Sequence, residues 1–233
     1  MGERGGGPGT GGWKTALVAG LLGILIGAVA MAASSGYFVR SYLLDHPEIL
    51  PEAMERLQQR QAAEIVEDNR AAIEAPFHSA WAGAPDGDVV LVEFFDYACS
   101  YCRASNPDVE RLLAEDPRLK VVWRELPVLG PDSEAAARIS LAAARQGRFR
   151  QFYDRLFALG RPNEANVAAA AAGAGIRPEA DAPDVAAELA RNFDLARAIG
   201  ASGTPTFVVG DRILQGAVGY EALKQAIAEA RSG

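Results

Sequence analysis

The sequence predicts an α/β fold in which a small sheet is interrupted by a helical insertion. Three observations lead to this prediction. An apolar run at Val89–Phe95 is typical of a strand covered on both faces, and a second strand is expected at Leu119–Leu126 after an intervening helix. A long block of helices follows. The chain then returns to two strands and a final helix, an order typical of an α/β domain with an insertion.

Composition and charge exclude several classes of protein. The chain has 233 residues, of which 49% are hydrophobic and 23% charged, so it can bury a core without disulfides. A formal charge of −7 argues against a nucleic-acid partner, because nucleic acids demand a basic face. Two cysteines cannot make a disulfide-rich scaffold; they fit one bridge, half a metal site or a redox pair.

The N-terminus predicts export. Residues 1–14 are Gly-rich and expected to be a disordered leader, and residues 15–39 carry no charge. Ala16–Ala33 is apolar or Gly throughout, about the shortest run that spans a bilayer. It is either a transmembrane anchor in the inner membrane or a signal peptide cleaved after a small-residue site near Ala30. Both alternatives place the rest of the chain in the periplasm, an oxidising compartment.

Residues 40–81 are predicted to be a helical N-terminal segment. Asp45 and Pro47 suit a helix start, and the helix is expected to end near Ala75, before Pro76. Its apolar positions form a narrow, interrupted stripe: Leu50, Met54, Leu57, Ile65 and Ile73. Such an amphipathic helix either docks on its own domain or forms a stalk with copies of itself, giving a homo-oligomer.

Residues 82–233 are predicted to form the main domain, with the helical insertion at about 130–199. Ala82–Asp88 is expected to be a turn-rich linker. Helices are predicted at about Ser100–Ala114, Ser133–Ala144, Phe149–Ala158, Asn163–Ala172, Pro183–Ile199 and Tyr220–Ala230, and the last strands at Thr206–Val209 and Arg212–Gln215. Four aromatic residues share one face of their helix and are expected in the core: Phe149, Phe152, Tyr153 and Phe157.

Both cysteines stand at a strand-to-helix junction, in the stretch Cys99-Ser100-Tyr101-Cys102. Unpaired amide groups at the helix N-terminus and the helix dipole favour a thiolate at Cys99. Cys102 lies about one turn further on and can form a disulfide with Cys99. The pair is therefore predicted to be redox-active, with Cys99 exchanging disulfides and Cys102 resolving the mixed disulfide.

Three other interpretations of the cysteines compete with redox chemistry. The pair could form a merely structural disulfide, or remain as two inert buried thiols. A zinc site requires two further ligands, and the only histidines, His46 and His78, lie outside the predicted domain core. We therefore predict no metal and no organic cofactor, because the cysteines themselves are the redox centre.

Glu93 interrupts the apolar strand Val89–Phe95 six residues before Cys99. A carboxylate on a covered strand is costly without a partner or a task, and burial raises its pKa. Such an acid could accept the proton of Cys102 as that thiol resolves a mixed disulfide. Alternatively, Glu93 hydrogen-bonds within the fold or lies at an exposed strand end.

Gly203-Thr204-Pro205-Thr206 precedes the strand Thr206–Val209, and on spacing alone it is an ordinary turn. Together with FFDYACSYC it nevertheless resembles the thioredoxin superfamily, and more closely the DsbA-like exported thiol-disulfide oxidoreductases, from Val89 to about Ala230. The resemblance implies a cis Pro205 packed against the cysteines and a Thr204 backbone that binds substrate strands. It also implies that Cys99 is the nucleophile, Cys102 the resolving thiol and Glu93 the buried acid.

The N-terminal segment YLLDHPEILPEAMERLQ resembles a helical leader of ScsC-type, copper-resistance-associated proteins, in which the leader can trimerise the molecule.

The residues between the cysteines depart from those of DsbA, which carries Pro-His where this chain has Ser100-Tyr101. Without that histidine the reduced form is expected to be less stabilised. We therefore expect a reduction potential below the about −120 mV of DsbA, nearer the about −180 mV of protein disulfide isomerase.

The sequence thus predicts an exported thiol-disulfide oxidoreductase acting on cysteine-containing exported proteins. It would need a membrane redox partner that re-oxidises or re-reduces it, and the direction, oxidase or isomerase, is left open. The alternative is a membrane-tethered binding or chaperone module on a thioredoxin fold, capturing metal at its thiols without redox turnover.

Overall fold

The computed structural model describes residues 17–18, 20–24, 27, 31, 39–177 and 182–232. The chain divides into two compact units, Met1–Leu57 and Gln58–Gly233. The expected leader, residues 1–14, and most of the apolar span 15–39 lie outside the described residues. Within the part of the chain that is described, no helix is both long and apolar enough to cross a membrane.

Unit one contributes a short helical stretch at residues 39–45 and the beginning of helix α2 (Ile49–Glu74). Its large apolar side chains are exposed, and they include three of the predicted stripe: Leu50, Met54 and Leu57. Single exposed apolar residues are ordinary, but several along one helix are typical of a surface that contacts another protein or a membrane.

Unit two is built on a five-stranded sheet in the order β1-β3-β2-β4-β5. The strands are β1 (Trp81–Gly83), β2 (Val89–Phe95), β3 (Leu119–Glu125), β4 (Thr206–Val209) and β5 (Arg212–Gln215). The β2 and β3 strands pair in parallel, with Glu93 opposite Trp123, and the other neighbours are antiparallel. Parallel β2 and β3 require a crossover, which helix α3 (Ser100–Glu115) provides.

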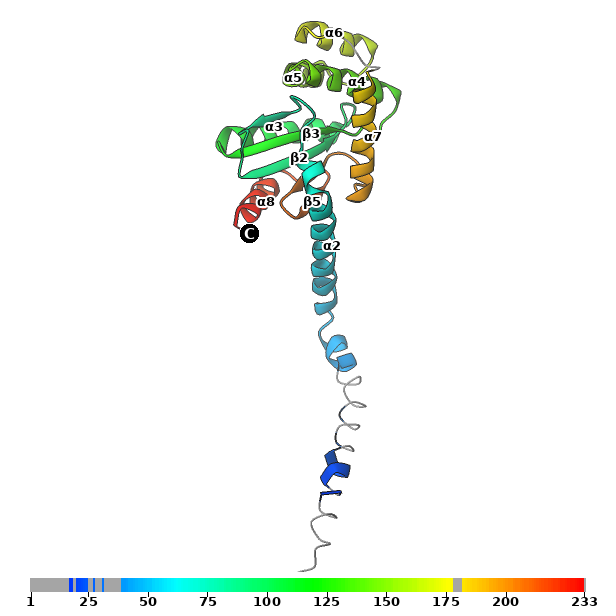
Figure 1. Cartoon of the computed structure of the whole chain (residues 1–233), viewed down its shortest axis with the longest axis vertical. Coiled ribbons are helices and arrows are strands. Elements are labelled where there is room, and N and C mark those ends of the chain that lie inside the picture. Colours follow the sequence, from blue (N-terminus) through cyan, green and yellow to red (C-terminus); the bar gives the residue numbers. More distant parts are fainter. Residues whose placement is uncertain are drawn as a thin grey trace, which may run out of the picture. The chain divides into compact units, whose positions relative to one another are not determined.

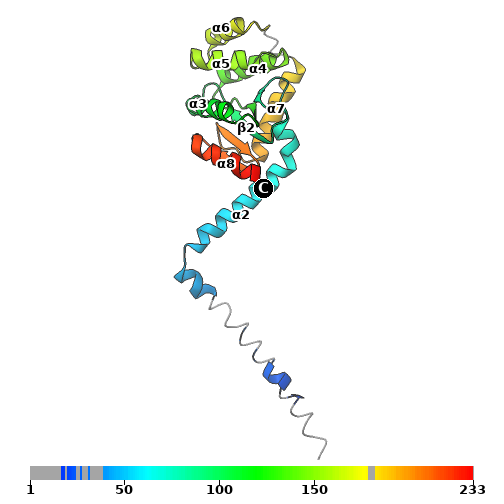
Figure 2. The ribbon, with the colours of Figure 1, turned by 90° about the vertical axis from the view of Figure 1, so that its left-hand side faces the viewer.

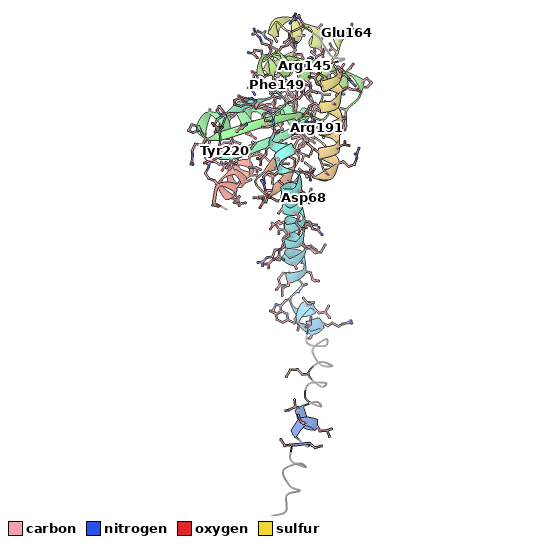
Figure 3. All side chains as sticks on the ribbon, in the orientation of Figure 1. Asp68, Arg145, Phe149, Glu164, Arg191 and Tyr220 are labelled. Carbon is pink, nitrogen blue, oxygen red and sulfur yellow. The ribbon has the colours of Figure 1, made fainter. Side chains whose placement is uncertain are left out.

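The helical insertion lies between β3 and β4, as predicted. Its helices are α4 (Pro131–Arg145), α5 (Phe149–Leu159), α6 (Glu164–Ala174) and α7 (Pro183–Ala198). The chain ends with α8 (Tyr220–Ser232). Within unit two, α4, α5 and α6 gather at one end, and α8 lies at the opposite end (Figures 1 and 2). Tyr220, labelled in Figure 3, begins α8 and hydrogen-bonds Glu115 at the end of α3.

The two faces of the sheet bury different residues, because side chains alternate along each strand. Leu91 and Phe95 pack in a cluster with α3, α5 and α8, and the four predicted aromatic residues of α5 all lie buried there. Val92 and Phe94 face the other side, where Val66 and Ile73 of α2 join residues of α7. The C-terminal part of α2 therefore packs on this face of the sheet in unit two.

A buried arginine fastens this docked end of α2. Arg124 of β3 donates hydrogen bonds to the carbonyls of Ala72, Ile73 and Ala75, which are the unpaired acceptors at the end of a helix. It also pairs with Glu188 of α7 at 3.0 Å, and both side chains are almost fully buried. One side chain thus joins a strand, the end of α2 and α7.

The structure corrects two details of the prediction. Residues 82–88 were expected to form a linker, but Trp81–Gly83 is an edge strand that pairs with β3. Three residues are too few to show an alternating pattern, so the sequence carried no signal for it. On α2, Ile65 is more exposed than expected, and Val66 instead packs in the core.

Candidate functional site

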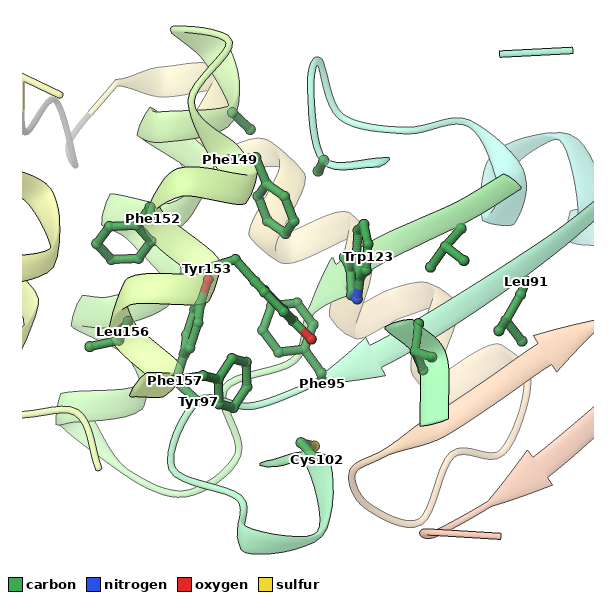
Figure 4. Packing of buried hydrophobic residues seen from close by; sticks show 14 of the residues in the cluster. Leu91, Phe95, Tyr97, Cys102, Trp123, Phe149, Phe152, Tyr153, Leu156 and Phe157 are labelled. Carbon is green, nitrogen blue, oxygen red and sulfur yellow. The ribbon is translucent and has the colours of Figure 1, made fainter. Parts of the chain in front are cut away.

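The two cysteines lie at the N-terminus of α3, buried against the core. Cys99 is the N-cap residue, with extended backbone angles (φ −78°, ψ 119°), and Cys102 lies in the first turn. Both thiols are free, and Cys102 is fully buried while Cys99 is 6% exposed. Figure 4 shows Cys102 beside the aromatic cluster that includes Phe95 and Tyr97. Only Cys99 therefore has access to a partner from outside.

The loop before β4 meets Cys99. The Thr204–Pro205 peptide bond is cis, as the resemblance implies. The Cys99 Sγ donates a hydrogen bond to the Thr204 carbonyl at 3.2 Å, although 105 residues separate them. The following carbonyl, that of Pro205, accepts from the Gly216 amide at 2.8 Å, which anchors the loop to the end of β5. The fold thus brings Cys99, Cys102, Thr204 and Pro205 together.

Glu93 lies inside the sheet, not at an exposed strand end. Its carboxyl is fully buried, and Oε2 accepts a hydrogen bond from the indole N–H of Trp123 at 3.0 Å. Burial raises the pKa of Glu93 to about 8, while the Trp123 hydrogen bond acts in the opposite direction. Burial also raises the pKa of Cys102, and the negative charge of Glu93 raises it further. Glu93 and Cys102 are therefore electrostatically coupled groups that compete for a proton.

Asp96 is a buried site residue that the sequence analysis did not single out. Its Oδ1 accepts from the Ala98 amide at 2.8 Å, and its Oδ2 accepts from Val128 and Leu129 at 2.9 and 3.0 Å. One carboxylate therefore fixes the segment before Cys99 to the loop after β3. The signal was present, because an aspartate directly after a covered strand is an exception to its apolar pattern.

Glu125, at the end of β3, is another buried acid that the sequence did not lead us to expect in the site. Burial raises its pKa well above the usual range, and Ser140 hydrogen-bonds it. Ser140 in turn hydrogen-bonds the Tyr97 hydroxyl at 2.8 Å. The same reasoning that singled out Glu93, a charge in a covered strand, could have found Glu125.

No group of three or more His, Cys, Asp or Glu side chains in the described part of the chain could hold a metal ion. The site presents two free thiols, the buried Glu93 carboxyl and the Thr204 carbonyl, and a pair of neighbouring thiols is the arrangement that thiol-disulfide exchange uses. The fold and the Cys-x-x-Cys dithiol at the start of α3 define a protein of the thioredoxin-like class.

The chain belongs to the DSBA-like thioredoxin domain family, whose sequence profile matches residues 90–228, more than half of its length. The profile of the copper resistance protein ScsC N-terminal domain matches residues 36–64. The second match covers the segment in which the leader resemblance was noted.

Solved structures agree with this assignment. A thioredoxin-like oxidoreductase from Silicibacter pomeroyi DSS-3 is 40% identical, with a TM-score of 0.63 over 66% of this chain and 92% of that chain. The catalytic domain of Proteus mirabilis ScsC is 28% identical (TM-score 0.68; 73% of this chain, 99% of that chain). A periplasmic thioredoxin-like protein from Salmonella enterica serovar Typhimurium is 29% identical (TM-score 0.66; 70% and 96%).

Curated relatives are longer proteins. A Na⁺/H⁺ antiporter NhaA 1 of Salinispora arenicola is 32% identical over 65% of this chain, and NhaA 3 of Salinispora tropica is 33% identical over 64%. The matched segment makes up 24% of each relative. This chain therefore spans about a quarter of the length of the curated relatives that it matches.

Proposed function

We propose that this protein is an exported thiol-disulfide oxidoreductase that exchanges disulfides with other exported proteins through Cys99 and Cys102. The observation that carries the proposal is the hydrogen bond from Cys99 to the Thr204 carbonyl. It supports the proposal because Cys99, the more accessible of the two cysteines at 6% exposed, faces the loop whose Thr204 backbone would pair with an extended substrate.

The proposed step in the reducing direction begins when the Cys99 sulfur attacks a substrate disulfide. One substrate sulfur leaves as a thiolate, and a mixed disulfide forms on Cys99. Cys102 then gives its proton to the Glu93 carboxylate and attacks Cys99, releasing the second substrate thiolate. The substrate gains two electrons and the protein becomes the Cys99–Cys102 disulfide. The oxidising direction is the reverse, with Glu93 returning the proton to Cys102. The cycle needs no metal or organic cofactor.

The proposed location is the periplasm, either anchored in the inner membrane by residues 15–39 or released after cleavage. The ScsC N-terminal match and the likeness to a periplasmic thioredoxin-like protein support this location. A membrane redox partner would restore the active redox state. Self-association through the helical N-terminal segment, residues 40–81, is proposed because Met54 and Leu57 are exposed in unit one.

Matched cysteine variants test the proposal. Cys102→Ser should trap mixed disulfides with exported proteins on Cys99, visible as reductant-sensitive bands, and Cys99→Ser should trap none. The wild type should reduce insulin, and Cys99→Ala should not. A wild type that neither reduces insulin nor transfers disulfides would favour the binding or chaperone module instead.

The direction of electron flow has its own experiment. Alkylation and gel shift in growing cells report the redox state of the two thiols. A mostly oxidised pair supports a dithiol oxidase, and a mostly reduced pair supports an isomerase or reductase.

A further inference from the structure

The carboxyl of Glu93 is held by a single neighbour. Glu93 and Trp123 are partners in the β2–β3 register, so their side chains lie on the same face of the sheet. The indole N–H donates to Oε2, and Oε1 has no hydrogen-bond partner among the described residues. A buried oxygen without a partner is unusual, and a redox or catalytic role is one of its known explanations.

A cation lies over the indole ring of Trp123. The guanidinium carbon of Arg150, on α5 of the helical insertion, is 4.7 Å from the centre of the indole ring. Ion pairs with Glu110 of α3 at 2.7 Å and with Asp154 of α5 at 3.0 Å hold this guanidinium in place. A cation over an aromatic face draws electron density from the ring, which makes the indole N–H a better donor to Glu93.

Charged and titratable groups reach Glu93 from every element packed on this face of the sheet. They are Cys102 and Glu110 on α3, Glu125 on β3, and Arg150 and Tyr153 on α5. After burial and the Trp123 hydrogen bond, Glu110 raises and Arg150 lowers the pKa of Glu93. Arg150 is thus the cation among these groups that favours the carboxylate form.

We propose that Arg150, acting through Trp123 and through space, is a positioning residue that keeps the Glu93 carboxyl able to accept the proton of Cys102. This inference rests on the proposed role of Glu93. In the step concerned, Cys102 loses its proton to Glu93, the Cys99–Cys102 bond forms, and the bond from Cys99 to the partner sulfur breaks. The leaving sulfur keeps the electron pair. Arg150 touches none of the reacting atoms.

The test follows release of glutathione from a Cys99–glutathione mixed disulfide by quenched flow and alkylation, from about pH 5 to about pH 10. In the wild type, the rate should rise with pH through an inflection set by Glu93. Arg150→Met and Trp123→Phe should move that inflection upward by about one pH unit, because each removes a group that favours the carboxylate. Arg150→Lys keeps the charge and should restore most of the wild-type profile.

A matched control separates a local effect from loss of net charge. Arg138 of α4 pairs with Glu134 at the surface, so Arg138→Met removes one positive charge without touching Trp123 or Glu93. Its inflection should equal that of the wild type. An Arg150→Met profile that coincides with the Arg138→Met profile overturns the inference.

Glu93→Gln distinguishes failure of this inference from failure of the proposed function. If Glu93→Gln keeps the wild-type inflection, the role of Glu93 as proton acceptor is wrong, and the inference falls with it. If Glu93→Gln loses the inflection but Arg150→Met leaves it in place, only the inference is wrong. Carbon-13 NMR titration of the glutamate carboxyls measures the ionisation of Glu93 directly, with its signal assigned by its loss in Glu93→Gln. If Trp123→Phe does not fold, comparing this titration in wild type and Arg150→Met decides whether the inference holds.

Discussion

Replacing Glu93 by glutamine should stabilise the protein, and the gain should grow with pH. The folded-state pKa of Glu93 is raised from 4.5 to about 8 by burial. Between these two values the folded state holds a proton that the unfolded state has released, so wild-type stability falls as the pH rises through this window. Below pH 4.5 both states are protonated and the penalty vanishes.

The size of the effect follows from about 1.4 kcal/mol for each pH unit between the two pKa values. At pH 7 the penalty is about 3 kcal/mol, and above pH 8 it levels off at about 5 kcal/mol. Glutamine cannot ionise, so Glu93→Gln lacks the penalty. Any cost of the new amide is the same at each pH, and the pH dependence of the difference isolates the ionisation.

Urea unfolding of the reduced proteins at several pH values measures this difference. Glu134→Gln, which changes an exposed carboxylate paired with Arg138, is the control and should show no such growth. A difference between Glu93→Gln and wild type that is constant from about pH 4 to about pH 8 would refute the reasoning.

Four further predictions concern other parts of the molecule. The reduction potential, measured in glutathione buffers, should lie below the about −120 mV of DsbA, and a value at or above it contradicts the expected effect of Ser-Tyr between the cysteines. Asp96→Ala removes the acceptor of three amides and should lower the unfolding free energy by about 3 kcal/mol in urea titration; a loss below about 1 kcal/mol disagrees. Arg124→Met removes the buried cation from Glu188, which keeps its ion pair with the more exposed Arg191 at 3.2 Å, and should cost about 3–5 kcal/mol, most of which Arg124→Met with Glu188→Leu should recover. Met54→Ser with Leu57→Ser should reduce self-association in sedimentation, and an unchanged mass would exclude this face.

Most of the fold could be predicted because its elements carry strong periodic signals. The apolar run of β2 and the periodicity of the later helices predict the element order. The predicted helix ends agree with the structure to within about two residues, except at the start of α2, which was expected just after Asp45 and begins at Ile49. β1 could not be predicted, because its pairing with β3 depends on contacts distant in sequence. The aromatic face of α5 was correctly assigned to the core for the opposite reason, since four large side chains recur at helical spacing.

The candidate site was only partly visible in the sequence. Cys99, Cys102 and Glu93 are close in sequence, and a charge in an apolar strand draws notice. Thr204 joins the site through its contact with Cys99, which lies 105 residues earlier in the chain. From spacing alone, the segment that contains Thr204 is interpreted as an ordinary turn. Trp123 and Arg150 could not be found, because an aromatic residue in a strand and an arginine on a helix are common. The β2–β3 register places Trp123 beside Glu93, and the packing of α5 places Arg150 over Trp123.

The two cysteine sulfurs are buried to different degrees, and this difference affects which of them peroxide can oxidise. Peroxide converts thiolates first to sulfenic and then to sulfinic and sulfonic acids, and it requires contact with an ionised sulfur. Cys102 is sealed from solvent, and burial raises its pKa and so disfavours its thiolate. Irreversible oxidation should therefore fall on Cys99 alone, and the intact Cys102 should rescue a sulfenic acid there by closing the disulfide and expelling water.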